Sequence, residues 1–287
     1  MKRWLLGFSG LLMSGMAVAA GPAAARKSVQ ASMLVKGTIE VAPDGHVSSY
    51  ALDHPEKLPP VVKGLVQGAV SHWTFDPIVV DGHPAIAKGA MSLRVIASPL
   101  GDGRYSIRVG GVVFGNGRDK TGHAVTAIHR SIPKYPERAV IERVAGTVYV
   151  VVRIDRQGRV ADAVARQVDL RVIGDSYEMA SWRGMLSDAA LRAIRRWTFR
   201  TPTVGKDAQA PYWQVTIPVA FTLRGPGVPQ SERPAVYGQW QAYVPGPVHP
   251  VPWADKPMLA GNTDAVPDGG VFRADPLLHL RTPLGGS

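Results

Sequence analysis

The sequence predicts an α+β protein of two small domains, each a short antiparallel sheet with helices packed on one face, followed by an extended C-terminal tail. Apolar runs at 34–41 and 148–154 each end in a turn that contains glycine, which is typical of a β-hairpin. Each hairpin is followed by a stretch with helical periodicity that ends in Trp-Thr-Phe, at 73–75 and at 197–199. After residue 223, proline and glycine become frequent and no periodicity is left.

The first domain is predicted over residues 31–115. A strand at 34–41 and a returning strand at 47–52 flank the turn pair Asp44-Gly45. Pro59-Pro60 opens a helix, because proline fits the first helical turn, where its missing N–H is not needed. The other predicted elements are a helix face of Val62, Leu65, Val66 and Ala69, the aromatic residues Trp73 and Phe75, a strand at 91–97, and a strand pair within 104–114 that bends at Gly110-Gly111.

The second domain is predicted over residues 128–224. Tyr135-Pro136 begins a short helix that runs to Arg143, and Gly146 leads into a β-branched strand. Asp155 and Gly158 frame the hairpin turn, where glycine takes a positive backbone angle. The later elements are a returning strand at 160–168, an insertion around 172–184, a helix capped by Ser187 or Asp188 that buries Leu191, Ile194 and Trp197, the aromatic Phe199, and a last strand at 212–223.

The two domains share landmarks in the same order, which predicts an internal repeat. Trp73 and Phe75 match Trp197 and Phe199, and Asp44-Gly45 matches Gln157-Gly158. The insertion around 172–184 makes the second copy longer. Chance reuse of Trp-x-Phe and turn glycines, which are common in small α+β domains, is the alternative interpretation.

Residues 1–20 have the pattern of a secretory signal peptide. Two basic residues are followed by an apolar segment at 4–16 and by small residues at 17–21 that suit cleavage. The apolar segment is short for a membrane span of roughly 20 residues. We therefore expect export, and an uncleaved anchor in the inner membrane is the alternative.

The composition limits the chemistry of the chain. It has 287 residues and no cysteine, which excludes a thiol nucleophile, a disulfide, a lipoprotein anchor and a cysteine-type zinc site. The formal net charge is +11, or +9 once Lys2 and Arg3 leave with the signal peptide. Such a charge favours peripheral contact with anionic envelope polymers, although ordinary solubility also explains it. Nucleic acid is not an expected partner in an exported compartment.

The tail at 225–287 is rich in proline and glycine and is predicted to be extended or disordered. Trp240, Tyr243 and Trp253 are aromatic residues through which it would lie on a domain. Residues 115–122 are polar and glycine-rich and are predicted to link the two domains.

The last strand of the second domain predicts a binding surface. Pro218 cannot donate a ladder hydrogen bond, so the strand belongs at a sheet edge. An exposed edge accepts an extended peptide as an added strand, with backbone bonds for affinity and side-chain pockets for selectivity. We expect Tyr212, Gln214, Thr216 and Pro218 to contact such a partner.

Residues 131–223, about a third of the chain, resemble the C-terminal domain of the TonB family. The resemblance rests on Tyr135-Pro136, Gly146, Asp155-x-x-Gly158, Trp197-x-Phe199 and the final apolar strand. It implies a binding module of the bacterial periplasm that pairs with a short box on TonB-dependent outer-membrane transporters and delivers energy from an inner-membrane motor. It also implies that Tyr135, Pro136 and the 212–223 edge are the contact surfaces.

Three departures from the family separate binding from energy transduction. Residues 1–20 contain no histidine to engage a motor, a folded domain replaces the proline-rich spacer, and Ile132 stands where the best-known member has glutamine. We therefore predict a periplasmic protein that binds an envelope partner without transmitting force. The alternatives are an energy transducer for TonB-dependent transport and a structural envelope protein that dimerises through its sheet edges.

Catalytic motifs are weak, and no catalytic residue, metal or cofactor is predicted. Gly115–Thr121 resembles a phosphate-binding loop but lacks a glycine before its lysine. Gly174-Asp175-Ser176 resembles a hydrolase tripeptide with no histidine nearby in sequence. His123 and His129 do not have metal-ligand spacing on a helix. The sequence thus favours a non-enzymatic protein.

Overall fold

In the computed structural model, the described residues are 29–80, 83–115, 122, 124–223, 236–253, 266, 270–273 and 278–284. The predicted signal peptide at 1–20 and His123 lie outside them, as does most of the predicted linker at 115–122. Within this part of the chain, mostly antiparallel sheets combine with a few helices, in agreement with the predicted α+β class.

The first large sheet comes mainly from the N-terminal part of the chain. Its elements and neighbours are β1 (Gln30–Val41), β2 (Val47–Leu52), the 3-10 turn η1 (Pro55–Lys57), α2 (Pro60–Val70), β3 (Val79–Val80), β4 (His83–Pro84), β5 (Ala87–Gly101), β6 (Arg104–Phe114) and, from the tail, β12 (Gln241–Tyr243). The strand order is β12-β1-β5-β6, with β2 also paired to β1, and every pairing is antiparallel.

The second large sheet follows in sequence. Its elements and neighbours are β7 (Thr126–His129), α3 (Glu137–Ile141), β8 (Gly146–Ile154), β9 (Val160–Leu170), α4 (Ser176–Ile194), β10 (Thr198–Arg200), the 3-10 turn η2 (Lys206–Gln209), β11 (Trp213–Phe221) and, from the tail, β13 (Phe272–Arg273). The strand order is β13-β11-β8-β9, all antiparallel, while β7 and β10 form a separate pair.

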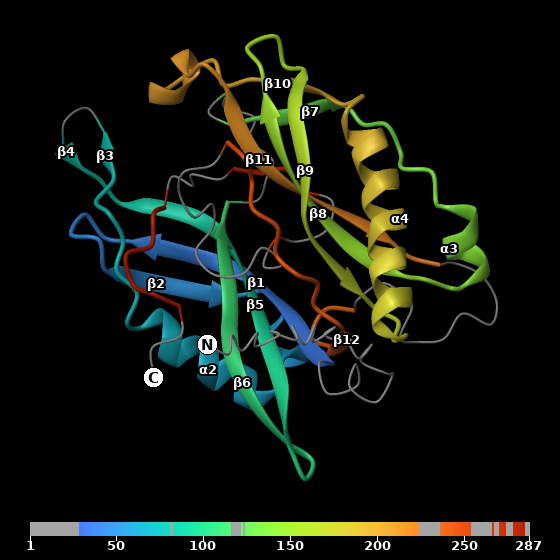
Figure 1. Ribbon diagram of the computed structural model, residues 1–287. Coiled ribbons are helices and arrows are strands. Elements are labelled where there is room, and N and C mark those ends of the chain that lie inside the picture. Colours follow the sequence, from blue (N-terminus) through green and yellow to red (C-terminus); the bar gives the residue numbers. More distant parts are fainter. Residues whose placement is uncertain are drawn as a thin grey trace, which may run out of the picture.

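The two sheets face each other through their helix-free sides. Helix α2 lies on the outer face of the first sheet and α4 on the outer face of the second (Figure 1). Between the sheets, the Arg94 guanidinium of β5 donates to the Tyr149 hydroxyl of β8 over 3.4 Å. The order of layers is therefore helix, sheet, sheet, helix.

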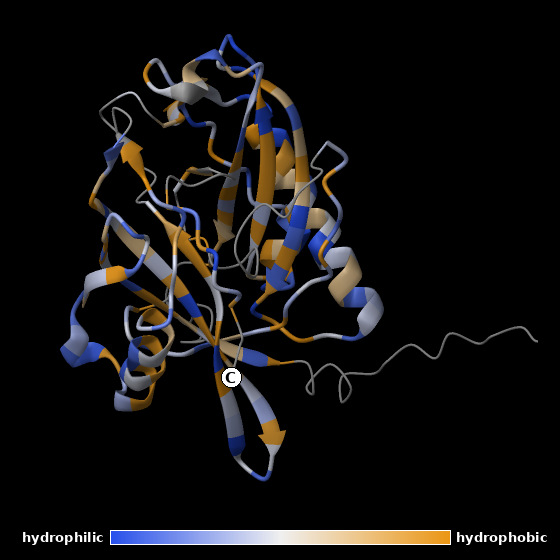
Figure 2. Ribbon diagram, turned by 90° about the vertical axis from the view of Figure 1, so that its left-hand side faces the viewer, coloured by the Kyte–Doolittle hydropathy of each residue, from blue (hydrophilic) through white to orange (hydrophobic). Residues whose placement is uncertain are grey.

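Each sheet buries its own apolar core under its helix. Since successive strand residues point to opposite faces, alternate side chains of the strands enter the core, and Figure 2 shows this banding along them. In the first core, Val62, Val66 and Val70 of α2 pack on the sheet. In the second core, Leu186, Ala190 and Ile194 of α4 pack on β8, β9 and β11.

The two predicted Trp-Thr-Phe segments make the same contacts with the two hairpin turns. Phe75 N–H donates to the Gly45 carbonyl over 2.8 Å, and Phe199 N–H donates to the Gly158 carbonyl over 2.7 Å. Both glycines have positive φ, +90° and +74°. A Cβ at Gly158 would lie 2.0 Å from the Phe199 carbonyl oxygen, so the close approach requires glycine.

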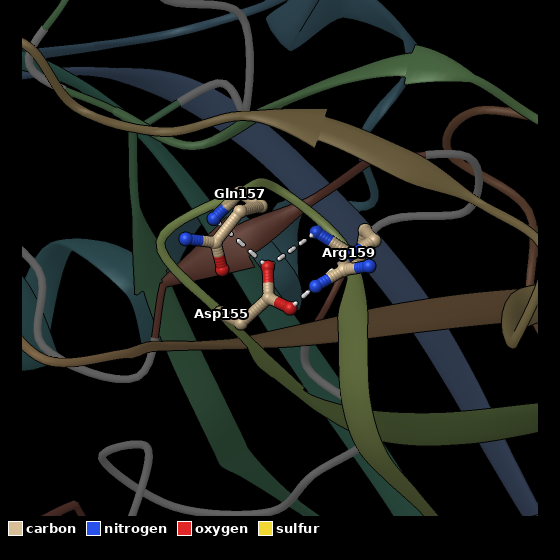
Figure 3. Close-up of polar contacts among 3 residues, drawn as sticks. All are labelled: Asp155, Gln157 and Arg159. Atoms are coloured by element: carbon tan, nitrogen blue, oxygen red, sulfur yellow. Dashed lines mark hydrogen bonds and ion pairs between the residues drawn. The ribbon is translucent and has the colours of Figure 1, made fainter.

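Asp155 fixes the second turn. Its Oδ1 accepts from the backbone N–H of Gln157 over 2.9 Å and of Arg159 over 2.8 Å (Figure 3). Its Oδ2 accepts from the Arg159 guanidinium over 3.3 Å. This is the local hydrogen bonding that favours aspartate at the start of turns.

Helix α4 begins earlier than the sequence analysis predicted. Asp175 is its N-cap and forms a capping box with Glu178, so the cap is not Ser187 or Asp188. The predicted insertion at 172–184 is therefore largely the first half of this helix, which buries Met179 and Trp182.

The prediction for 104–114 was also wrong in detail. This stretch is one continuous strand, β6, and the hairpin turn with β5 lies at 101–103, where three residues have positive φ. Gly110 is needed for packing, because a Cβ there would lie 2.3 Å from Ile96 Cδ1.

The tail forms short strands that the sequence analysis did not predict. β12 pairs with β1, and Val244 directly after it bridges to Leu170 of β9. β13 pairs with β11 in the second sheet. Leu278 then enters the first core, and Leu280 bridges to Phe75. The tail thus contacts the first sheet, the second sheet and the first sheet again.

Replacing Gly158 with alanine should destabilise the protein. The substitution forces a positive φ on a residue with a Cβ, which costs about 1–3 kcal/mol before the contact with Phe199 is counted. Gly184→Ala is the matched control, since Gly184 lies exposed within α4 and a Cβ there meets nothing within 4 Å. It should stabilise by about 0.5–1 kcal/mol. Chemical denaturation measures both changes, and equal effects of the two substitutions would contradict this account of the turn.

Candidate functional site

Strand β11 carries three of the six residues predicted to contact a partner, and Tyr212 directly precedes it. It pairs with β8 along its whole length, from Trp213 opposite Ile154 to Phe221 opposite Gly146. Its odd-numbered residues enter the core under α4, as the burial of Val215 and Ile217 shows. Gln214, Thr216 and Pro218 therefore share the helix-free face.

The outer edge of β11 is not open as predicted. Val215 is paired with Arg273 and Thr216 with Phe272, so the tail strand β13 covers this part of the edge. Thr216 is 0% exposed. Beyond Thr216, no further strand pairs with this edge within the described residues. Pro218 lies in this unpaired part, where its missing N–H costs no ladder hydrogen bond.

A second tail segment covers Gln214 and its neighbours. Trp253 Nε1–H donates to Gln214 Oε1 over 2.7 Å. The Arg153 guanidinium lies 5.3 Å from the ring centre of Trp253 and 5.9 Å from that of Tyr212, within cation–π range. Two residues before Trp253, Val251 packs on Val151 of β8.

Phe272 occupies an apolar pocket at the paired edge. It is 4% exposed and packs with Val113 of β6 and Val266 of the tail. The Thr216 hydroxyl beneath this region is buried and has no hydrogen-bond partner within the described part of the chain. An unsatisfied buried hydroxyl is unfavourable.

Tyr135 and Pro136 do not belong to the same surface. The Tyr135 hydroxyl donates to the Val144 carbonyl, and its ring packs edge-on against Phe221 with centres 5.3 Å apart. Pro136 is the N-cap of α3. These residues lie at the far end of β11 from Gln214, about 23 Å away at 3.3 Å per residue, and on the core side. Tyr135 thus orders the start of α3.

The predicted structural residues lie at close contacts. A Cβ at Gly146 would lie 2.4 Å from the Asp169 carbonyl oxygen. Trp197 Nε1–H donates to the Ser131 carbonyl over 2.8 Å, and Arg130 lies 5.5 Å from its ring centre. Trp73 and Phe75 pack edge-on against Phe114 in the first core.

The sequence analysis missed Arg153, Val113 and Phe272 as parts of the surface. Arg153 alternates with apolar residues in β8 and could have been placed on the helix-free face by period alone. Phe272 follows a pair of glycines in the tail, and nothing in the sequence indicates that it reaches β11. For Trp253, the sequence predicts only an aromatic contact of the tail with a domain, without naming Gln214 or Arg153 as its partners.

The weak catalytic motifs have structural explanations where they are described. Asp175 accepts from the Glu178 N–H over 2.8 Å as the helix cap, and Ser176 is the first residue of α4. His129 is exposed on β7, paired with Thr198. No group of three or more His, Asp or Glu residues suited to a metal occurs in the described part of the chain.

None of the helices in the described ranges is long and apolar enough to cross a membrane. No protein-family model matches the chain, and no curated protein matches it.

Glu142 joins α3 to α4 next to the Tyr135-Pro136 segment, and this contact should depend on pH. Its carboxylate accepts from the Arg138 guanidinium over 2.6 Å and from the Trp182 indole N–H. The bond from Arg138 and then the bond from Trp182 lower the pKa of Glu142. Because the folded-state pKa is lowered, the stabilisation is complete above the unfolded-state pKa and is lost as pH falls through the folded-state pKa.

The Trp182 indole N–H resonance should therefore titrate in acid with a midpoint below the ordinary glutamate value. The substitution Glu142→Gln should abolish this titration. A midpoint at or above the ordinary value, or an unchanged titration in the variant, would contradict the assignment.

Proposed function

We propose that the chain is a non-enzymatic periplasmic protein of the TonB C-terminal type, which binds an extended segment of an envelope protein by strand addition at β11. A TonB-dependent outer-membrane transporter is the first candidate partner. The observation that carries the proposal is the pairing of β11 with β13, an extended segment remote from it in sequence. The edge of β11 thus accepts an added strand within this chain.

β11 is a rigid acceptor. β8 holds it along its full length, and Trp213, Val215 and Ile217 anchor it in the core under α4. A preorganised edge loses little freedom when a peptide pairs with it, so more of the contact energy contributes to affinity. Pro218 brings no N–H to the ladder, so the hydrogen bonds offered to a partner are concentrated in the first half of the strand.

The helix-free face of β11 supplies selectivity in addition to backbone pairing. Gln214 offers an amide, Tyr212 an aromatic ring that is 45% exposed, and Arg153 of the neighbouring strand a cation. Strand addition uses such alternating side chains to distinguish one extended segment from another.

A synthetic peptide that carries the transporter box should bind the full-length chain with an affinity in the micromolar to millimolar range. Amide resonances of residues 213–217 should shift on binding, because the backbone N–H and C=O groups that β11 offers to a partner strand lie before Pro218. Titration calorimetry and NMR measure the two effects.

The matched controls are two backbone-methylated forms of the same peptide. Methylation at the alternate residues that face β11 should abolish binding, since it removes the donated N–H groups, whereas methylation at the intervening residues should not. Absence of binding at millimolar peptide, or equal binding of both methylated forms, would refute strand addition. A concentration-dependent dimer that binds no peptide would instead favour a structural envelope protein.

A further inference from the structure

We infer that the surface around β11 is an aromatic-anchored strand acceptor whose resident ligand is the chain's own tail, and that a partner segment must displace this tail. The partner fitted by this surface is an extended polypeptide with an aromatic side chain for the Arg153–Gln214 position and a bulky apolar side chain for the position of Phe272. The displacement of the tail by a partner rests on the proposed function.

The first anchor point recognises an aromatic ring with an N–H donor. Gln214 Oε1 accepts from the Trp253 indole over 2.7 Å, and the Arg153 guanidinium lies over the same ring at 5.3 Å. The Arg153 guanidinium also lies 5.9 Å from the ring centre of Tyr212. A cation within cation–π distance of the occupied position favours an aromatic occupant over an aliphatic one.

The second anchor point is the apolar pocket of Phe272. This ring packs with Val113 of the first sheet and with Val266 of the tail itself, while its backbone pairs with Thr216. Val113 is therefore the contact that would remain for the side chain of a partner. Its position depends on Gly270, because a Cβ there would lie 2.0 Å from the Phe272 ring. Phe272 therefore combines backbone pairing with the burial of its side chain, and strand addition uses the same combination.

The resident strand is a weak ligand for this surface. Within the described residues, β13 pairs with β11 at two positions, Val215 and Thr216. Phe272 brings no polar atom to the buried Thr216 hydroxyl, which is left without a hydrogen bond among the described residues. A partner with a longer pairing and a polar group at that point would form contacts that the described part of the tail does not form.

The tail can leave β11 without leaving the protein. On one side, β12 remains paired with β1. On the other side, Leu278 lies in the first core, and Arg281 donates its backbone N–H to the Thr74 carbonyl over 2.8 Å. The contacts of Trp253 and Phe272 lie in small clusters apart from both cores. A partner segment that displaces Trp253 and Phe272 therefore replaces the tail at the edge of β11. The displaced tail stays tethered to the protein and competes with the partner for this edge as an intramolecular ligand.

The test compares peptide binding by the full chain and by three tail variants. Trp253→Ala and Phe272→Ala each remove one anchor of the resident ligand. Trp240→Ala is the matched control, since Trp240 is an exposed aromatic residue of the same tail. Thermal unfolding verifies that each variant is folded. Two fluorescent peptides serve as probes: one carries the transporter box, and the other carries the tail sequence 266–277 of this chain.

Each anchor substitution should tighten binding of the transporter-box peptide about ten-fold, because weakening a cis competitor raises the fraction of accessible edges. Trp240→Ala should leave the affinity unchanged. The tail peptide should bind the Phe272→Ala variant at residues 213–217 more tightly than it binds the full chain.

The outcomes separate this inference from the proposed function. Equal binding of the transporter-box peptide by all four proteins would overturn the inference and leave the proposed function standing. Binding of the tail peptide alone would support the acceptor and its resident ligand, but would contradict the transporter as partner. If the Phe272→Ala variant binds neither peptide, both the inference and the proposed function fail.

Discussion

Pairing of the tail strand β12 with β1, and of Val244 directly after it with Leu170, is the interaction on which the arrangement of the two sheets depends. The facing sides of the sheets carry polar groups, among them Ser32, Arg94 and Tyr149, which surround a cavity of about 60 Å³. Such faces gain little from apolar burial alone. The tail supplies what they lack, because it pairs with β1, bridges to Leu170 and inserts Val251 and Phe272 beside the second sheet. A segment with no sequence periodicity thus joins two sheets that each have their own core.

The same pairing determines which edges of the second sheet are exposed. Val244 bridges to Leu170, and His249 N–H donates to the Arg166 carbonyl over 2.7 Å, so the tail follows the outer edge of β9. β13 covers part of the opposite edge at β11. Covered edges protect a sheet from uncontrolled association. The two covers differ, however. In the described part of the chain, β13 pairs with β11 at two positions and buries the Phe272 ring, and this is the cover that a partner strand would replace.

The sequence predicted those features that short-range chemistry determines. The hairpin turns at Gly45 and Gly158 and the buried aromatic residues after each helix follow from backbone angle and apolar pattern. The first half of α4 was missed because Gly184 and several polar residues obscure its apolar stripe. β12 and β13 are too short to have a period, and their pairing depends on contacts far apart in sequence. Gln214 and Thr216 were placed on the correct strand because the apolar alternation of β11 is a local pattern. The contact of Tyr135 with Phe221 joins residues far apart in sequence, so the sequence analysis did not predict that this ring packs on the core side.

Disulfide trapping tests most directly whether the partner and the tail share one edge. The chain has no cysteine, so a Thr216→Cys/Phe272→Cys variant can form a single defined disulfide. Directly opposed antiparallel residues have Cα atoms about 4.5–5.5 Å apart, within the range for such a bond. The account predicts that the oxidised variant does not bind the transporter-box peptide and that reduction restores binding at residues 213–217. Equal binding by the oxidised and reduced forms would contradict it.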